Sequence, residues 1–132
     1  MCEELAVCDG LPAVLCHGDL SLKNIIINQE EITLIDWDDA YSLCCLDDVA
    51  RLTLWMSLNY GKSMAAGFRN AFLEHYESEC DGRLFEKVES ILHIWHGIDG
   101  MNYFFGKPQY DRLKEIVRES LARNGMTGIY AL

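Results

Sequence analysis

The chain has 132 residues, half of them apolar, so it is long enough to form one domain with a buried core. Its formal net charge of -10 and its pI near 4.7 argue against a nucleic-acid or anionic-membrane partner, because both need a basic surface. Cationic partners or a bound metal ion fit this charge better, although an ordinary acidic protein has the same composition.

No segment has the pattern of a secretion signal or of a membrane-spanning helix. The first residues, MCEELAVCDGLPAV, carry acids where a signal peptide needs bases, and no apolar stretch approaches the roughly 18 residues of a spanning helix. None of the cysteines forms a C-x-x-C pair, which disfavours a zinc knuckle. We expect a cytoplasmic protein with reduced thiols at Cys2, Cys8, Cys16, Cys44, Cys45 and Cys80.

The first third of the chain has the composition of short strands. The run AVLC (13–16) ends at a His-Gly pair, and two β-branched runs, NIIIN (24–28) and ITLID (32–36), follow. The three residues between those runs, QEE, predict a tight hairpin.

After residue 40 the apolar pattern becomes helical. Residues 46–59 are apolar on most faces, which predicts a buried helix, and residues 62–79 carry aromatic and Met side chains at steps of four. A third pattern runs from Leu84 to Phe105, and a last helix precedes Gly125, which predicts its C-terminal cap. The predicted fold class is α+β and mostly α, with a small β-element followed by a helical body.

The stretch LCHGDLSLKNIIINQEEITLIDWDDA (15–40) carries the chemistry. His17, Asp19 and Asn24 fit the pattern H-x-D-x-x-x-x-N, and the predicted hairpin ends at Asp36. This is the order of a kinase catalytic loop and its metal-binding aspartate. One carboxylate takes or orients the proton of the acceptor hydroxyl, while an amide oxygen and a second carboxylate hold Mg²⁺ on the phosphates of ATP.

Three blocks in this order, HGDLSLKN, IDWDDA and DDVARL, resemble the aminoglycoside phosphotransferase and choline kinase-like family of small-molecule kinases. The resemblance covers roughly residues 12–60 and implies a protein-kinase-like C-terminal lobe. It also implies an enzyme that transfers the γ-phosphoryl group of ATP to the hydroxyl of a small substrate, which is cationic in several members.

The resemblance assigns roles to single residues. It implies that Asp19 is the catalytic base, that Asn24 and Asp36 are the magnesium ligands, and that Asp48 braces the catalytic loop. His17 is expected to anchor the loop by hydrogen bonds, whereas Asp38 is either part of the site or a support. Lys23 lies where it could approach a phosphate, but a solvated loop lysine is the reading that we favour.

A complete kinase of this family has an N-terminal lobe before its catalytic loop, and only sixteen residues precede His17. We therefore expect one domain over residues 1–132, a partial C-terminal lobe without the N-lobe. It consists of the catalytic loop and metal-binding hairpin (12–40) and a helical subdomain (46–124).

The third helical pattern carries polar and aromatic residues that have two readings. His93 and His96 are three residues apart on a predicted helix, which is compatible with a metal site but more typical of a plain helix face. Acceptors of this family sit against the C-terminal helices, so the resemblance places a possible acceptor pocket at Trp95, His96, Asp99 and Tyr103. The alternative is that these residues belong to the core.

Three functional hypotheses remain open. In the first, the chain is the C-lobe of an ATP- and Mg²⁺-dependent small-molecule kinase and is inactive on its own. The second is one half of a two-chain kinase, in which another chain or self-association supplies what is missing. The third is a non-catalytic binding or scaffold protein that has kept the fold. Three polar groups of a metal site favour the first two.

Overall fold

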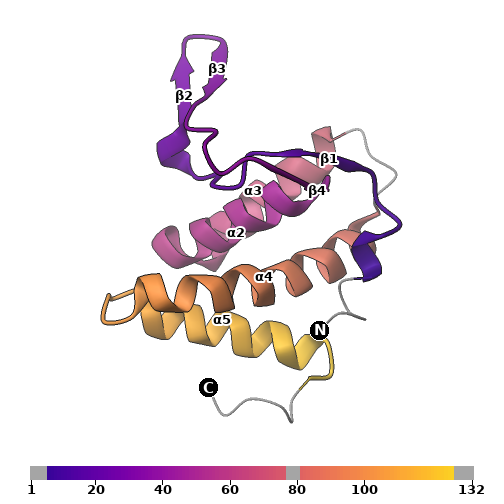
Figure 1. Cartoon of the computed structure of the whole chain (residues 1–132), viewed down its shortest axis with the longest axis vertical. Coiled ribbons are helices and arrows are strands. Elements are labelled where there is room, and N and C mark those ends of the chain that lie inside the picture. Colours follow the sequence, from indigo (N-terminus) through magenta and orange to yellow (C-terminus); the bar gives the residue numbers. More distant parts are fainter. Residues whose placement is uncertain (1–5, 77–80, 127–132) are drawn as a thin grey trace.

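The computed structural model describes residues 6–76 and 81–126 and has an α+β, mostly helical fold, which confirms the predicted class (Figure 1). Two short 3-10 helices, η1 (Ala6–Cys8) and η2 (Leu22–Asn24), lie in the N-terminal third. The strands form two antiparallel pairs: β1 (Ala13–Cys16) with β4 (Tyr41–Cys44), and β2 (Ile25–Asn28) with β3 (Glu31–Leu34).

Two features of the β-region differ from the sequence prediction. Glu31, expected in the turn, is the first residue of β3 and lies opposite Asn28, so the turn is shorter by one residue. Strand β4 was not predicted, because YSLC is too short to show a strand period beside the strong helical pattern that follows. Its pairing with β1 closes the segment between them into a loop that carries the predicted site.

Four helices form the body: α2 (Asp47–Tyr60), α3 (Lys62–His75), α4 (Gly82–Phe104) and α5 (Tyr110–Arg123). They agree with the predicted helices to within a few residues, except that residues 77–79 of the second lie outside the described part of the chain. As predicted, Gly125 ends the last helix: it adopts a φ of 72°, and Met126 N–H donates to the Leu121 carbonyl over 2.9 Å.

Helix α2 is buried because α3 and α4 pack directly on it, while α5 packs on α4. One core cluster joins it to β4 and α4 through Ala50, Phe85 and Leu92, and another joins it to α4 and α5 through Leu54, Ile94 and Val117. Figure 1 shows α2 between the strands and α4, with α5 beyond. The N-terminus of α2 is thereby held at a fixed place beneath the loop that follows β1.

The β2–β3 hairpin projects away from the helices (Figure 1). All four residues of β3 are exposed, and Ile27 and Ile32, paired across the hairpin, are 71% and 69% exposed. The hairpin is therefore attached to the body mainly through the residues at its two ends. Among the described residues, no helix combines the length and the apolar character needed to cross a bilayer.

Candidate functional site

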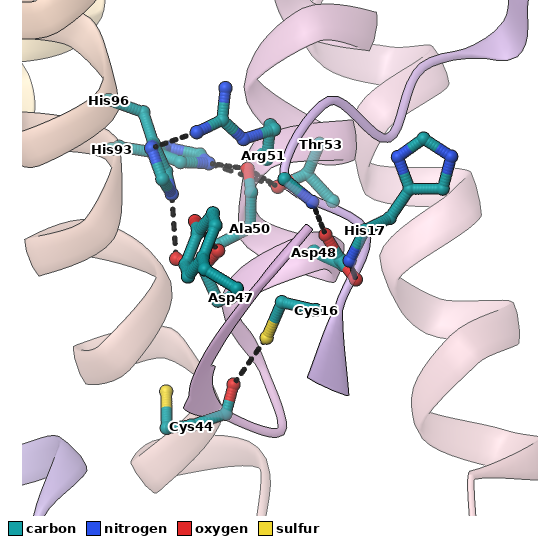
Figure 2. Close-up of polar contacts among 12 residues, drawn as sticks. Cys16, His17, Cys44, Asp47, Asp48, Ala50, Arg51, Thr53, His93 and His96 are labelled. Carbon is teal, nitrogen blue, oxygen red and sulfur yellow. Dashed lines mark hydrogen bonds and ion pairs between the residues drawn. The ribbon is translucent and has the colours of Figure 1, made fainter. Parts of the chain in front are cut away.

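The loop after β1 is fixed to α2 by Asp48. The carboxylate of Asp48 accepts hydrogen bonds from the backbone N–H groups of His17, over 2.6 Å, and of Gly18, over 3.2 Å (Figure 2). Gly18 has a φ of 83°, and a Cβ there would collide with the Asp39 carbonyl group. Glycine is required at this point of the loop, both for its backbone conformation and for its lack of a side chain.

The His17 side chain holds the same loop against the end of the hairpin. It is 1% exposed, its Nε2 lies 2.8 Å from the Ile35 carbonyl oxygen, and its Nδ1 accepts from the Asp19 N–H over 3.3 Å. An Nδ1 that accepts leaves the proton on Nε2, so Nε2 donates to the Ile35 carbonyl. Both ring nitrogens thus have partners: one is the backbone N–H of Asp19, and the other is the carbonyl of Ile35, the residue before Asp36.

Asn24 and Asp19 are in direct contact. The Asn24 amide nitrogen donates to the backbone oxygen of Asp19 over 2.9 Å and to its carboxylate Oδ2 over 3.2 Å. Asn24 is 4% exposed. Because its nitrogen is directed at Asp19, the amide oxygen is the atom that can ligate a cation.

The hairpin sets the place of Asp36 relative to Asn24. Its ladder pairs Ile25 with Leu34 and continues through a bond of 3.0 Å from the Ile35 N–H to the Asn24 carbonyl, so Asp36 is one residue beyond the partner of Asn24. Asp36 is exposed and has a φ of 66°, a left-handed conformation that among the described non-glycine residues is shared only by Gln29 in the turn. Such a conformation costs about 1 kcal/mol, and its occurrence outside a turn points to a functional constraint.

Lys23 supplies a positive charge to this acidic site. Its Nζ lies 2.9 Å from Asp19 Oδ2. The pKa of Lys23 is raised, chiefly by the hydrogen bond to Asp19 and further by the charges of Asp19 and Asp36. Both carboxylates therefore stabilise a cation at the same position. An exposed side chain such as Lys23 can move aside at little cost, since exposed ion pairs contribute under about 1 kcal/mol.

The residues present fit a magnesium ion. Mg²⁺ prefers oxygen ligands and is commonly held by one or two protein groups together with phosphate and water. An amide oxygen from Asn24 and an exposed carboxylate from Asp36 make such a donor set, whereas no group of three or more His, Cys, Asp or Glu in the described chain forms a complete metal cage. The arrangement suits a metal ion whose remaining ligands are phosphate oxygens and water.

A cleft of about 520 Å³ opens beside Asp19 between η2, α2 and the C-terminal half of α4. Three of the four predicted acceptor-pocket residues, His96, Asp99 and Tyr103, line it together with Asp19 and Lys23. Trp95 is not among the lining residues and is 48% exposed. The other lining residues are Leu20, Asp39, Arg51, Leu54, Trp55, Leu58, Asn59, Gly100, Phe104, Lys107 and Gln109.

His96 joins a buried network at the floor of this cleft. Its Nε2 lies 2.8 Å from the carboxylate of Asp47, which is fully buried and also accepts a hydrogen bond from the Tyr41 hydroxyl, while its Nδ1 lies 3.1 Å from Arg51 Nη2 (Figure 2). Burial would raise the pKa of Asp47, but the bonds from His96 and Tyr41 and the charge of Arg51 outweigh it and lower the pKa. Asp47 therefore remains ionised inside the protein.

His93 belongs to a second buried network and not to a metal site shared with His96. Its Nε2 lies 3.0 Å from the Ala50 carbonyl and 2.9 Å from Thr53 Oγ1 (Figure 2). Thr53 in turn donates to Glu89 over 2.6 Å. Burial lowers the pKa of His93 to about 4, so the ring is neutral at pH 7. Both histidines are committed to partners on α2, which overturns the metal reading of this pair.

The cysteines in the described part of the chain, Cys8, Cys16, Cys44 and Cys45, are free thiols, and Cys2 and Cys80 lie outside it. Cys16 Sγ donates to the Cys44 carbonyl over 3.6 Å (Figure 2). Burial raises the pKa of Cys16 to about 11, whereas a hydrogen bond from Cys8 lowers that of Cys44 to about 7. Cys8 and Cys44 are neighbours in the core that joins η1 to β4.

Sequence reasoning missed several residues of the site, and it named Asp38, for which the structure shows no side-chain partner among the described residues. Asp38 is exposed and has neither a hydrogen bond nor an ion pair with any described residue. Its neighbour Asp39 lines the cleft, as does Arg51. The sequence analysis assigned a role to Asp48 and none to Asp47. Two consecutive Asp residues in the first turn of a helix point to different faces, and this was a signal that each has its own partners.

Comparison with known proteins adds an independent observation. A model of the phosphotransferase enzyme family matches residues 3–84, a segment that includes the loop, the hairpin, α2 and α3. Neither the curated proteins nor the solved structures contain a match to the chain. The family match covers more than half of the sequence and includes all the residues predicted to bind metal or to act as the base, so the chain belongs to the phosphotransferase enzyme family.

Proposed function

We propose that the chain is a kinase-like C-terminal lobe of an ATP-dependent phosphotransferase, which transfers the γ-phosphoryl group of ATP to a hydroxyl group of a small molecule. Asp19 acts as the base, and Asn24 and Asp36 hold Mg²⁺. The observation that carries the proposal is the contact of the Asn24 amide with Asp19, on a hairpin whose other end delivers Asp36.

The chemistry requires little more from the protein than positioning and charge. Bound Mg²⁺ would neutralise charge on the phosphates of ATP. Asp19, at the edge of the cleft, is placed to accept the proton of a hydroxyl group that lies in the cleft. Lys23, released from Asp19, can contact a phosphate oxygen, and this movement would free the Asp19 carboxylate for the acceptor.

The cleft supports a substrate that carries a positive charge. The ammonium group of Lys107 lies 3.3 Å from the centre of the Tyr103 ring, so this ring already interacts with a cation. Asp39 and Asp99 line the same cleft. An amino alcohol or an aminoglycoside presents both a hydroxyl and an ammonium group, and it could take the place of Lys107 on the ring.

The β-region supports an arrangement in which more protein covers this lobe. Leu15 is 68% exposed and Trp37 is 42% exposed, and Ile27 and Ile32 on the hairpin are exposed as well. Several exposed apolar side chains in one region of a fold favour an interaction surface. We propose that a nucleotide-covering lobe packs here, from the same polypeptide or from another chain. The surface also fits the alternative of a scaffold protein, for which metal and nucleotide are irrelevant.

The test is the turnover of Asp19→Asn, measured as phosphorylated product in a preparation that contains the covering lobe. The variant should lower kcat at least about a hundredfold while KM for ATP changes little, because the carboxylate acts during transfer and not in holding ATP. Glu30→Gln, which removes an exposed acid at the hairpin turn, is the control and should keep normal turnover. Near wild-type kcat for Asp19→Asn would contradict the proposal.

A further inference from the structure

A second cleft, of about 460 Å³, lies at the other end of α4 and gathers positive charge. Its walls come from α3, the first half of α4 and the end of α5. It is lined by Arg69, Arg83, Glu86, Lys87, Glu89, Ser90, Arg123 and Asn124. The chain has only 11 Lys and Arg residues against 21 Asp and Glu, so four cations around one cleft are a marked local excess.

Three of these cations have no partner within the described chain. The side chains of Arg83, Lys87 and Arg123 make no hydrogen bond or ion pair with any residue in the ranges 6–76 and 81–126. Lys62, by comparison, lies 2.6 Å from Glu119 on a neighbouring helix. In a protein with a large excess of acids, unpaired cations that converge from two helices leave a positive potential in the cleft.

The acids of the cleft do not cancel this potential. Glu89 is 3% exposed, accepts from Arg69 Nε with both carboxylate oxygens, over 3.0 Å and 2.8 Å, and also accepts from Thr53. Its charge is thus balanced by Arg69. Glu86 remains against the three unpaired cations, which leaves a net charge of about two positive units, equal and opposite to that of a phosphate monoester near pH 7.

The placement of Arg83 runs against the preference of the helix. It lies in the first turn of α4, where the helix dipole favours acids; the acid at this end is the N-cap Asp81, which accepts from the Leu84 N–H, and the turn itself contains none. Lys87 and Ser90 follow at steps of four and three, so they share one face of the helix with Arg83. A local arrangement that opposes a stabilising rule is typical of a functional surface.

We propose that this cleft binds a small phosphate-bearing molecule, held by Arg83, Lys87 and Arg123, with room for an organic group beside the phosphate. The site is separate from the cleft at Asp19: Lys87 and Asp99 are twelve residues apart on α4, which is about 18 Å along the helix axis. It requires neither Mg²⁺ nor the proposed phosphoryl transfer.

The experiment is a titration of the chain without Mg²⁺, at constant ionic strength, with inorganic phosphate, glycerol 3-phosphate and uncharged glycerol. Amide NMR signals near Ser90 and Asn124 should shift with both phosphates in a saturable manner and should not respond to glycerol. The tighter of the two phosphates identifies a free phosphate ion or a monoester as the source. Shifts centred on Asp19 and Lys23 would overturn the proposal.

Paired charge variants separate a specific site from general attraction. The double variant Arg83→Gln, Lys87→Gln should raise Kd at least about tenfold, since each lost partner removes a charge-assisted hydrogen bond. Lys62→Gln, Lys114→Gln removes the same charge outside the cleft and should leave Kd within about twofold, because screening limits distant charges. Equal weakening in both variants, or no saturable binding below about 10 mM, would overturn the proposal.

Discussion

Asp48 accepts the backbone N–H groups of two successive residues, His17 and Gly18, across 31 and 30 positions of sequence. Both residues are buried and neither belongs to a strand, so the Asp48 carboxylate supplies the hydrogen-bond acceptor that their N–H groups need. This contact turns the start of α2 into the support on which the loop with Asp19 is built.

Removing that support should destabilise the fold. Asp48→Ala leaves two buried N–H groups without an acceptor, which should lower the free energy of unfolding by about 2 to 4 kcal/mol, measured by urea denaturation. Asp48→Asn keeps one acceptor oxygen and should lose about half as much. Asp38→Ala, at an exposed residue, is the control and should stay within about 0.5 kcal/mol of wild type. A loss for Asp48→Ala no larger than the control would contradict this role.

Glycine at position 18 serves two needs that substitution can separate. Gly18→Ala must accommodate a positive φ and also a clash with the Asp39 carbonyl, whereas Gly106→Ala has a similar φ of 74° but open space around its Cβ. We expect a loss of about 1 kcal/mol for Gly106→Ala and at least about 3 kcal/mol for Gly18→Ala, by thermal or urea unfolding. Equal losses would show that the loop can move away from Asp39.

The buried His93 should make stability depend on pH. Burial lowers its pKa to about 4 in the folded chain from the ordinary value of 6.5, so the unfolded chain binds more protons between these values. The contribution is therefore complete above pH 6.5 and is lost as pH falls towards 4, by up to about 3 kcal/mol. His93→Gln should flatten the stability profile in this window. His75→Gln, at an exposed histidine, should not, and an unchanged slope in His93→Gln would refute the assignment.

The sequence predicted the helices and the hairpin well, because each has a strong local pattern. Buried α2 was recognisable from apolar residues on most of its faces, and nine of its fourteen residues are buried. Strand β4 was missed because its partner β1 lies 25 or more residues away and no local pattern indicates such a pairing. The stripe of Met64, Phe68 and Phe72 was also only partly a core face, since Met64 is 54% exposed.

In the candidate site, too, the residues joined by local contacts could be predicted, and those joined by contacts between distant segments could not. The spacing of His17, Asp19 and Asn24 was readable because the three lie in one loop, and their hydrogen bonds are local. The partnership of Asp47 with His96 joins residues 49 positions apart on different helices, and nothing in either segment indicates it. Arg51 lines the cleft because α2 packs on α4, and no local pattern in the sequence indicates this packing either.

The 132-residue chain alone should bind Mg²⁺-ATP weakly. The proposed ligands Asn24 and Asp36 hold one side of the phosphates, and the strands of residues 6–76 and 81–126 form no sheet of the kind that covers ATP in a complete kinase. We expect a Kd of about 1 mM or higher, near 4 kcal/mol of binding free energy, by calorimetry, and no turnover with kanamycin or choline. Micromolar affinity would mean that the chain, alone or as a dimer, builds the rest of the site itself.

The most direct test of the proposed metal site is the broadening of amide NMR signals by Mn²⁺, in the presence of ATP, on the 132-residue chain. The signals of Asn24, Ile35 and Asp36 should broaden at the lowest Mn²⁺ concentration, because the hairpin holds these residues together. Asp36→Ala should abolish the effect at these positions, and Asp111→Ala, which removes an exposed acid of α5, should leave it unchanged. Broadening centred on other residues, or broadening that survives Asp36→Ala, would contradict the account.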